Sequence, residues 1–428
     1  MKLEKGSSKL LNAWAFYDWA NSVYALVISS SIFPLYYGAL FRIKGIESIE
    51  LFGFDIRSES LISYTTALGF IIIAIISPLL SGIADYMGNK KFFLKFFCYL
   101  GSISCMLLYF FQLENILLGI FTYMTALIGF WGSLVFYNSY LPDIAYPDQQ
   151  DKVSAKGFGF GYLGSVILLI VNLAMVMLSP DENKLEMMRY SFLLVGIWWI
   201  GFSQYTYYYL PNNKNNNKLH KNIFFNGFKE LKKVWLQIKE IKPLKRYLGA
   251  FFVYSMAVQT VMIIAAYFGE KEVAWGSDEN RTTGLIGSIL LIQLIAILGA
   301  WLTSKASAKF GNIKVLIVIN FLWVIICTYA YFVITPSDFY IAAGSVGLVM
   351  GGIQSLSRST YSKLIPENTI DTTSFFSFYD VAEKIGIVIG MFLYGYITDI
   401  TGKAQNAILC LIIFFAVGII LLFRVPKK

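Results

Sequence analysis

The sequence predicts an all-α membrane protein in which twelve transmembrane helices form two pseudo-symmetric bundles of six. Three observations predict this fold class. Long apolar segments follow one another along the whole chain, charged residues are scarce, and two short motifs recur after about 223 residues. Of the 428 residues, 57% are hydrophobic and 14% are charged, whereas roughly a quarter of the residues in soluble domains are charged. This composition excludes a soluble globular protein.

Twelve segments are long and apolar enough to cross the hydrocarbon core, which takes about 20 residues in an α-helix. Their length and continuous apolar character favour helices over barrel strands, which would alternate in polarity over about ten residues. Only the short polar stretch Gln112–Asn115 separates the third segment from the fourth. The expected spans are 12–40, 60–84, 92–112, 115–140, 154–179, 189–210, 245–269, 283–305, 313–334, 338–364, 373–398 and 405–424.

A polar connection, residues 211–244, divides the chain into an N-terminal bundle, residues 1–210, and a C-terminal bundle, residues 245–428. It opens with the Asn-rich stretch Asn212–Asn217. Apolar residues then recur at helical spacing while lysines occupy other positions on the helix. This pattern predicts a basic amphipathic helix on the cytoplasmic leaflet, and a partner-binding or solvated linker is the alternative. The apolar positions are Phe224, Phe228, Leu231, Trp235 and Ile238.

Two motifs of the first half recur in the second half. SGIADYMGNKK, which begins at Ser81, matches SKASAKFGNIK, which begins at Ser304, at four positions with an offset of 223. YNSYLPD, which begins at Tyr137, is similar to YSKLIPE, which begins at Tyr361, with an offset of 224. Because each half contains an even number of helices, we expect parallel repeats about an axis along the membrane normal. This is the arrangement of an alternating-access carrier.

The distribution of Lys and Arg predicts the orientation of the chain. If the N-terminus is cytoplasmic, 26 of the 35 Lys and Arg residues fall on the cytoplasmic side and 8 on the outer side. Cytoplasmic loops carry such an excess, so we expect both termini in the cytoplasm. The first apolar segment is long and lacks a convincing cleavage site, so we expect it to remain as the first span. We predict a multi-pass protein of the plasma (inner) membrane.

Several other classes of site are not expected. The net charge of +9 is spread between apolar segments, which favours topology signals and contacts with membrane lipids over nucleic-acid binding. The four cysteines lie in apolar segments without a CxxC pair, so no metal, cofactor or disulfide is predicted. The GxGxxG pattern at Gly159, Gly161 and Gly164 lies in an apolar helix, which favours close helix packing over a dinucleotide site. The only histidine, His220, lies in the linker.

Lys384 is the ionisable residue placed deepest in a predicted span. It lies about 18 Å along the eleventh span, close to the midplane, where a charge is costly unless it is paired or hydrated. Asp380 lies four residues earlier on the same helix face, whereas Glu383 is turned away. We expect Lys384 to hold a substrate carboxylate or to exchange carboxylate partners during a transport cycle. An ion pair with Asp380 that only stabilises helix packing is the alternative.

SGIADYMGNKK resembles the loop signature of the major facilitator superfamily, Gly-x-Leu-Ala-Asp-Arg-x-Gly-Arg-Lys. Asp85, Gly88 and Lys90 match the signature. The resemblance implies a gate at Asp85, in a charged turn with Lys90 and Lys91 that makes ion pairs and helix-end contacts in one conformation. Topology signalling is the alternative. Ala308 replaces the acid in the second copy, so only the first copy is expected to form a charge-based gate. The departures from the signature are Ser81, Tyr86 and Asn89.

Further motifs together resemble the vacuole-effluxer-like branch of this superfamily, whose fungal members are autophagy-related vacuolar amino-acid exporters. The resemblance spans nearly the whole chain. It implies the major facilitator fold and, less directly, the export of amino acids. The motifs are YDWANS (17–22), FPLYY (33–37), FYNSYLPDIA (136–145), GYLG (161–164), WW (198–199), QSLSRS (354–359) and FFSFYDVAEKIG (375–386).

The resembled fold brings its first and tenth helices to a central cavity, which makes Asp18 and Arg358 candidate partners. Asp18 lies within YDWANS and could take up a proton, hold a cationic amine, or pair with Arg358 to close the inner gate. A capping acid near water is the alternative. Other polar side chains on helices that line the cavity in this fold are candidates for contacts with a polar solute, and hydrogen bonding between helices is the alternative. They are Tyr17, Asn21, Asn138, Gln354 and Tyr379.

The combined patterns predict a transporter, and not an enzyme, that moves a small polar solute by alternating access, either as a secondary active or as a facilitative carrier. Amino acids are the solute class that the resemblance suggests, and protons would be coupled through Asp18, Asp380 or Glu383. We expect a monomer. One alternative is a sensor with a transporter fold but no flux. An intramembrane lipid-modifying enzyme is another, but Asp143, Asp148 and Asp151 have no histidine beside them and are expected in a solvated turn.

Overall fold

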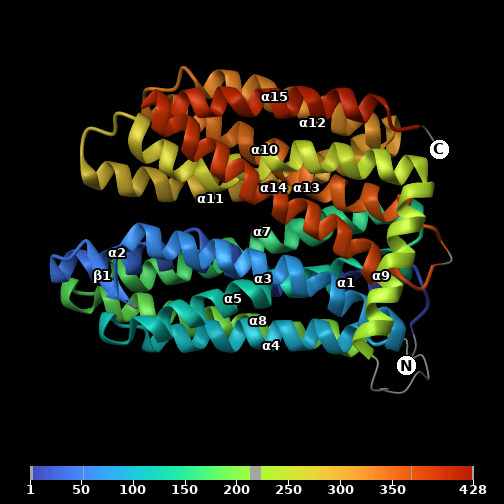
Figure 1. Cartoon of the computed structure of the whole chain (residues 1–428). Helices are drawn as coiled ribbons and strands as arrows, with labels where there is room; N and C mark the ends of the chain where they lie inside the picture. Colours follow the sequence, from blue (N-terminus) through green and yellow to red (C-terminus); the bar gives the residue numbers. More distant parts are fainter. Residues whose placement is uncertain (1–2, 52, 213–222, 368, 427–428) are drawn as a thin grey trace.

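The computed structural model describes residues 3–51, 53–212, 223–367 and 369–426. Long helices run side by side along one axis, with α10–α15 on one side of the molecule and α1–α8 on the other (Figure 1). We call these two sets the C-terminal half and the N-terminal half. Several residues used in the predictions above lie outside the described residues. They are Lys2, Asn213–Asn217, Lys218, His220, Lys221, Lys427, Lys428 and the side chain of Phe224.

The helices correspond to the twelve expected spans, and their ends differ from the predicted ones by at most about two turns. The N-terminal half contains α1 (Ser8–Val23), η1 (Tyr24–Ser29), α2 (Ile32–Lys44), β1 (Ser48–Leu51), β2 (Phe54–Arg57), α3 (Ser58–Met87), α4 (Lys90–Leu107), η2 (Leu108–Phe110), η3 (Leu113–Asn115), α5 (Ile116–Asn138), α6 (Leu141–Ile144), α7 (Pro147–Met177), η4 (Asp181–Asn183) and α8 (Lys184–Tyr209). The linker helix is α9 (Ile223–Glu240). The C-terminal half contains α10 (Lys242–Glu272), α11 (Asp278–Phe310), α12 (Asn312–Ala330), α13 (Pro336–Leu364), α14 (Thr372–Thr401) and α15 (Ala404–Phe423).

Eleven helical segments among the described residues are long and apolar enough to cross a membrane. The sixth expected span, α8, is 26 residues long but is not among them. Its many Trp and Tyr side chains lower its hydropathy, although such side chains are favoured where a membrane helix meets the headgroups. Because α8 packs against both α1 and α4 inside the bundle, it completes the set of twelve.

The first span is not one continuous helix, although the sequence predicts an uninterrupted span over residues 12–40. A π-helix, η1, follows α1, and the chain resumes as α2 after Ser30 and Ser31. The hydroxyl of Ser30 donates a hydrogen bond to the carbonyl oxygen of Ala25 at 2.9 Å. Such π-helical turns widen the helix locally and recur at functional sites. The break lies in the half of the span farther from the N-terminus.

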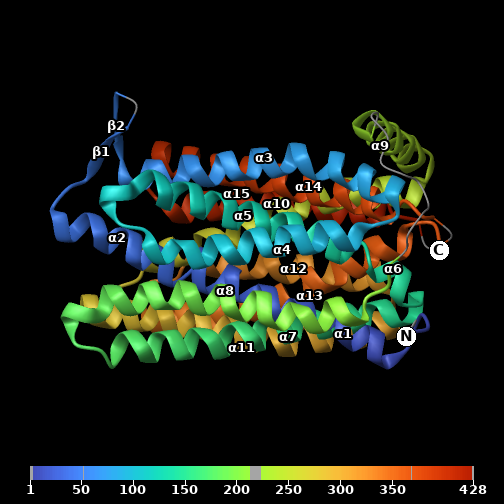
Figure 2. The same ribbon diagram turned by 90° about the horizontal axis from the view of Figure 1, so that it is seen from below.

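A short antiparallel hairpin follows α2 and projects from the end of the bundle (Figure 2). Ser48 pairs with Arg57 and Leu51 with Phe54. The sequence does not predict these strands, because strands of four residues have too few alternating positions to show a clear pattern. Both termini lie at the opposite end of the bundle (Figure 1). We call that end the terminal end and the end with the hairpin the hairpin end.

The apolar core divides into two clusters of buried side chains, one built almost wholly from α1–α8 and the other almost wholly from α9–α15. The recurring motifs occupy equivalent places in the two halves. Gly88 follows α3 with a φ of 62°, and Gly311 follows α11 with a φ of 87°. A side chain is strained at such positive φ values. Each glycine therefore allows a turn between two long helices, with ψ values of 30° at Gly88 and 149° at Gly311.

Candidate functional site

Arg358 of α13 lies against three helices of the N-terminal half. Its Nη1 and Nη2 atoms donate to Oδ2 of Asp18, on α1, at 3.2 and 3.1 Å. Nη1 also donates to Oδ1 of Asn138, on α5, at 3.2 Å. Nε donates to the hydroxyl of Ser154, on α7, and Nη2 to its carbonyl oxygen, both at 2.9 Å. These five hydrogen bonds use all five donors of the guanidinium group.

Aromatic rings complete the surroundings of this ion pair. The guanidinium carbon lies 4.8 Å from the ring centroid of Trp14 and 4.3 Å from that of Phe158. The hydroxyl of Tyr137 donates to Oδ2 of Asp18 at 2.9 Å. Arg358 is 3% exposed and Asp18 is 5% exposed. The predicted contact between Asp18 and Arg358 is thus present and sealed from water, while its role as a gate remains a prediction.

Gly157, Gly161 and Gly164, in and just before the GxGxxG pattern, let α7 approach α1 at this site. A methyl group on Gly157, just before the pattern, would collide with Oδ2 of Asp18 and lie 3.0 Å from Nη2 of Arg358. A methyl group on Gly161 would collide with the hydroxyl of Ser22 on α1. Close helix packing, as predicted, is therefore what these small residues provide.

We expect Gly157→Ala to destabilise the protein by about 1–3 kcal/mol, the usual cost of overpacking, and to lower its melting temperature in detergent. Gly159→Ala is the matched control on the same helix, because the nearest atom, of Ile297, lies 3.8 Å from the added methyl group. At that position, the higher helix propensity of alanine should stabilise the protein by up to about 1 kcal/mol. Equal melting temperatures for the two variants would contradict the packing argument.

A second buried ion pair lies on α14. Lys384 donates to Oδ1 of Asp380 in the predicted (i, i+4) pairing. Ser77, on α3 of the other half, donates to Oδ2 of Asp380 at 3.4 Å. The ammonium nitrogen of Lys384 lies 4.6 Å from the ring centroid of Trp131, on α5. Lys384 is 1% exposed. The pair therefore lies between the two halves and does not face lipid.

Within the described residues, Asp380 is the only hydrogen-bond acceptor recorded for Lys384. An ammonium group has three donors, so two of them have no hydrogen-bond acceptor among the described residues. Glu383 points elsewhere, as predicted, and its Oε1 accepts a hydrogen bond from Nε2 of Gln259, on α10, at 2.6 Å. This part of the interface thus combines one cation, two carboxylates and an indole ring.

The remaining predicted solute contacts are distributed around these two pairs. Gln354 accepts a hydrogen bond from the hydroxyl of Tyr162, on α7 of the other half, at 2.7 Å. Tyr379 stacks on Phe251, with ring centroids 4.0 Å apart. Asn21 accepts from the hydroxyl of its neighbour Ser22 at 3.3 Å, and Tyr17 packs on the ring of Tyr137. Tyr17 and Asn21 therefore lie inside the N-terminal half, whereas Gln354 reaches across the interface.

Asp85 makes a helix-end contact between the two halves. At the end of α3, its carboxylate accepts hydrogen bonds from the backbone N–H groups of Thr373 at 3.2 Å and Ser374 at 2.6 Å, in the first turn of α14. A carboxylate at a helix N-terminus is stabilised by the unpaired N–H groups and the helix dipole. Asp85 is 5% exposed. This contact joins the halves at the terminal end.

The two lysines beside Asp85 have different partners. Lys90 forms an ion pair of 2.5 Å with Asp143, on α6, and donates to the hydroxyl of Thr372, at the start of α14, at 2.9 Å. Lys90 therefore bridges the halves. Lys91 donates to the carbonyl oxygen of Leu210 at 2.8 Å and so stays within the N-terminal half.

Sequence reasoning missed a corresponding cluster at the second copy of the motif. Asp151, on α7, pairs with Lys363 of α13 at 2.6 Å. It also accepts from Nδ2 of Asn312 at 2.8 Å and from the hydroxyl of Ser307 at 3.0 Å. The second copy thus also makes a charged contact, because the opposing helix supplies the acid that Ala308 lacks. That only the first copy forms a charge-based gate stays a prediction. Asp151 is 7% exposed, so it does not lie in a solvated turn.

We expect Asp85→Ala to open the terminal end, because it removes two charge-assisted hydrogen bonds to α14. The readout is alkylation of Ser139→Cys, a position with 0% exposure beneath Lys90, by a water-soluble maleimide. A hydrogen bond to a charged group contributes about 1.5–3 kcal/mol, so the loss of even one should raise the alkylation rate by roughly tenfold or more. Asp148→Ala removes an exposed acid at the same end and serves as the control. An unchanged rate in Asp85→Ala would contradict a gate role.

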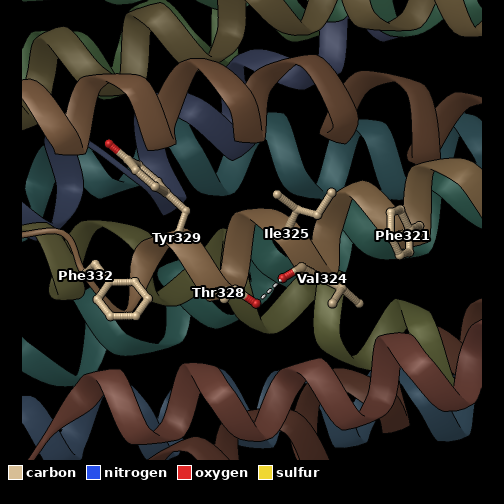
Figure 3. Close-up of a pocket in the computed structure, with 6 residues that line it drawn as sticks. All are labelled: Phe321, Val324, Ile325, Thr328, Tyr329 and Phe332. Carbon is tan, nitrogen blue, oxygen red and sulfur yellow. Dashed lines mark hydrogen bonds between the residues drawn. The ribbon is translucent and has the colours of Figure 1, made fainter.

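Together these contacts close the terminal end and bury the candidate site. A cavity of about 340 Å³ lies away from the interface, on α12, and its lining contains no charged side chain (Figure 3). Several of its lining residues are exposed on the outside of the bundle, among them Phe321 and Phe332. It suits an acyl chain better than a polar solute. Within the described residues, no group of three or more potential metal-ligating side chains is present.

Comparisons with known proteins place the chain in a family. A model described as vacuole effluxer Atg22 like matches residues 6–428. The uncharacterized MFS-type transporter YxiO of Bacillus subtilis (strain 168) is 33% identical over 433 residues, which cover 99% of this chain and 96% of that protein. Autophagy-related protein 22-1 of Penicillium rubens is 24% identical over 89% of this chain and 77% of its own length.

Solved structures of major facilitator superfamily transporters share the fold. The transporter FucP in the outward conformation superposes with a TM-score of 0.71 at 15% identity, covering 98% of this chain and 99% of its own. The human organic anion transporter MFSD10 superposes with a TM-score of 0.66 at 12% identity, and the match covers 97% of this chain and 98% of that protein. The predicted fold class is confirmed, and the relatives are transporters rather than enzymes. The chain belongs to the vacuole effluxer Atg22-like family of major facilitator superfamily transporters.

Proposed function

We propose that this protein carries a small polar solute through the membrane by alternating access, with the Asp380–Lys384 pair on the solute path. The observation that carries the proposal is the position of this pair. It is buried at the interface of the two halves, contacts Ser77 and Trp131 of the opposite half, and lies deep within the span of α14. Buried charge at such depth is costly and is characteristic of solute and ion pathways.

The Asp18–Arg358 pair has the geometry of a gate rather than of a binding site. All donors of the guanidinium group are occupied by residues of the opposite half, so a solute cannot contact it without displacing one of them. Opening the terminal end requires these bonds to break, together with the contacts of Asp85 and Asp151. In an alternating-access cycle the two halves, 1–210 and 245–428, rock against each other. The contacts of Arg358, Asp85 and Asp151 would then hold the terminal end closed.

The solute class follows from the chemistry around Lys384. Its remaining donors suit a carboxylate, and the carboxylates of Asp380 and Glu383 suit an ammonium group or a transferred proton. A free amino acid carries both charges. The family description, vacuole effluxer, names movement of a solute out of a compartment. The excess of Lys and Arg at the terminal end favours a cytoplasmic position of that end, and the proposed protein is a monomeric carrier of the plasma membrane that exports its solute.

The test is counterflow of a labelled amino acid into proteoliposomes that contain the purified protein. Solutes are first selected by a thermal-shift screen of metabolites, which is repeated with Lys384→Ala. A solute whose stabilisation disappears in the variant, and which exchanges across wild-type vesicles, supports the proposal. Stabilisation of equal size in both proteins contradicts a binding role for Lys384. Binding without flux in wild-type vesicles supports a sensor instead.

A further inference from the structure

The linker helix α9 lies crosswise at the terminal end, beside α3 and the start of α14 (Figures 1 and 2). Val234 and Ile238 of α9 are buried, with 0% and 2% exposure, and belong to the apolar cluster of the C-terminal half. The backbones of α9 and α3 touch where Gly227 meets Gly82. A methyl group on Gly82 would collide with the carbonyl group of Gly227, and a methyl group on Gly227 would lie 2.7 Å from Ile83. The first part of α9, around Gly227, therefore packs closely on α3 of the N-terminal half.

A second face of α9 contacts the C-terminal half. Lys233 donates to Oδ2 of Asp371, the residue before α14, at 2.7 Å. The ring of Trp235 packs on Phe378, with centroids 5.3 Å apart. The hydrogen bond to Asp371 raises the pKa of Lys233 above its ordinary value, so Lys233 stays charged at neutral pH. Because α9 contacts α3 and α14 at once, it ties the two halves together next to Asp85.

The outer face of α9 is apolar and basic. Its exposed apolar side chains include Phe225, Phe228 and Leu236, with exposures of 61%, 59% and 50%. The lysines lie between them, and within the described residues none forms an ion pair; they are Lys229, Lys232 and Lys239. Exposed apolar side chains and lysines on a helix at a membrane surface favour contact with anionic phospholipid. Since α9 crosses the last two turns of α3, it lies at headgroup depth.

We propose that α9 is a lipid-sensitive strap, which holds the terminal end closed through Lys233 and Trp235 and is released by anionic phospholipid headgroups. The reason is a difference in contacts between two states. With the end closed, Lys233 and Trp235 are occupied by Asp371 and Phe378. When α14 moves away, both side chains can contact the anionic headgroups that the neighbouring lysines already bind. A ligand favours the state in which it gains contacts, so anionic lipid favours the open end.

Only half of the Lys233 side chain is buried, with 49% exposed, whereas the Asp371 side chain is 4% exposed. A headgroup phosphate can therefore approach the cation while its partner stays in place. Glu230 also pairs with Lys233, at 3.1 Å. Because both residues lie on α9, this contact is the same in the closed and open states and does not favour either one. The inference rests on the proposed function only in that opening of the terminal end is a step of transport.

The experiment measures distances between spin labels at Phe92→Cys on α4 and Phe423→Cys on α15, two exposed positions at the terminal end. Cys410 is changed to Ser, and the buried Cys98, Cys105 and Cys327 are kept. The full-length protein is studied in nanodiscs of phosphatidylcholine alone and with phosphatidylglycerol added. We expect phosphatidylglycerol to raise the ratio of open to closed populations roughly fivefold, the effect of one lysine at an anionic surface.

Two sets of variants assign the effect to α9. Lys233→Gln should be more open in phosphatidylcholine and respond little to phosphatidylglycerol. The triple variant Lys229→Gln, Lys232→Gln and Lys239→Gln should stay closed in both lipids. A matched control removes three exposed lysines elsewhere at the same end and should respond like the wild type: Lys152→Gln, Lys305→Gln and Lys309→Gln.

The inference would be overturned by equal populations in the two lipids, a shift toward the closed state, an unchanged lipid response in the triple variant, or loss of the response in the control. A response restored only by adding an acidic protein would assign the outer face to a protein partner and would also overturn it. The distances need no transported solute. A protein that responds to lipid but carries no amino acid would therefore contradict the proposed function alone.

Discussion

Asp18→Ala is expected to abolish transport and to destabilise the protein by about 3–5 kcal/mol, the cost of leaving one member of a buried ion pair without its partner. Arg358 would keep its positive charge in a site that is 3% exposed, with Asn138 and Ser154 as its remaining acceptors. The measurement combines thermal unfolding in detergent with solute counterflow. The loss of stability should exceed that of any exposed acid at the same end, such as Asp148.

A double variant separates the charge from the shape of the site. In Asp18→Ala with Arg358→Met, no unpaired charge remains, and replacing a buried pair by apolar groups is often close to neutral. We expect stability to return toward that of the wild type while transport stays absent, because the gate contact is lost. If Asp18→Ala alone unfolds like the wild type, the two side chains are not a sealed pair. If the double variant transports normally, the pair is not a gate.

Lys384→Met is expected to lower transport by roughly 10- to 100-fold, because a hydrogen bond to a charged group contributes about 1.5–3 kcal/mol. The change also leaves Asp380 buried at 5% exposure without its counter-charge, so a fall in melting temperature should accompany it. The measurement is counterflow at several solute concentrations together with thermal unfolding. Weaker apparent binding is the signature of a side chain that holds the solute.

The control is Lys384→Met with Asp380→Asn, which removes both charges from α14. A pair that only stabilises helix packing should be replaceable in this way, and the double variant would then transport as the wild type does. A pair on the solute path should not be replaceable. We therefore expect the double variant to recover stability while its transport remains low. Glu383, which is bound to Gln259 in the same half, remains unchanged in both variants and provides a constant background.

The Lys384–Asp380 contact could be predicted because its partners are four residues apart on one helix, and helical geometry alone brings them together. The Asp18–Arg358 contact joins residues 340 positions apart. It was predicted only through the resemblance to a fold in which the first and tenth helices approach each other. Its other partners, such as Ser154, were not foreseen, because a serine in an apolar helix has many possible roles.

The Asp151–Lys363 contact was missed for a specific reason. Asp151 follows two other acids, Asp143 and Asp148, in a polar stretch, and such a stretch is usually solvated. In the structure the three carboxylates have separate surroundings: Asp143 pairs with Lys90, Asp151 with Lys363, and Asp148 is exposed. Complementary charges at matching helix ends of the two halves were the available signal.

The sequence by itself determined the number of spans, the equivalence of the two halves, the amphipathic linker and the pairing within α14. All of these depend on the spacing of residues along one helix or on local apolar length, which the chain records directly. Only the tertiary structure decided which charges meet across the interface, that the terminal end is closed, and that α9 touches both halves. Those contacts join residues far apart in the chain, and their distances are set by how whole helices pack, which local spacing does not record.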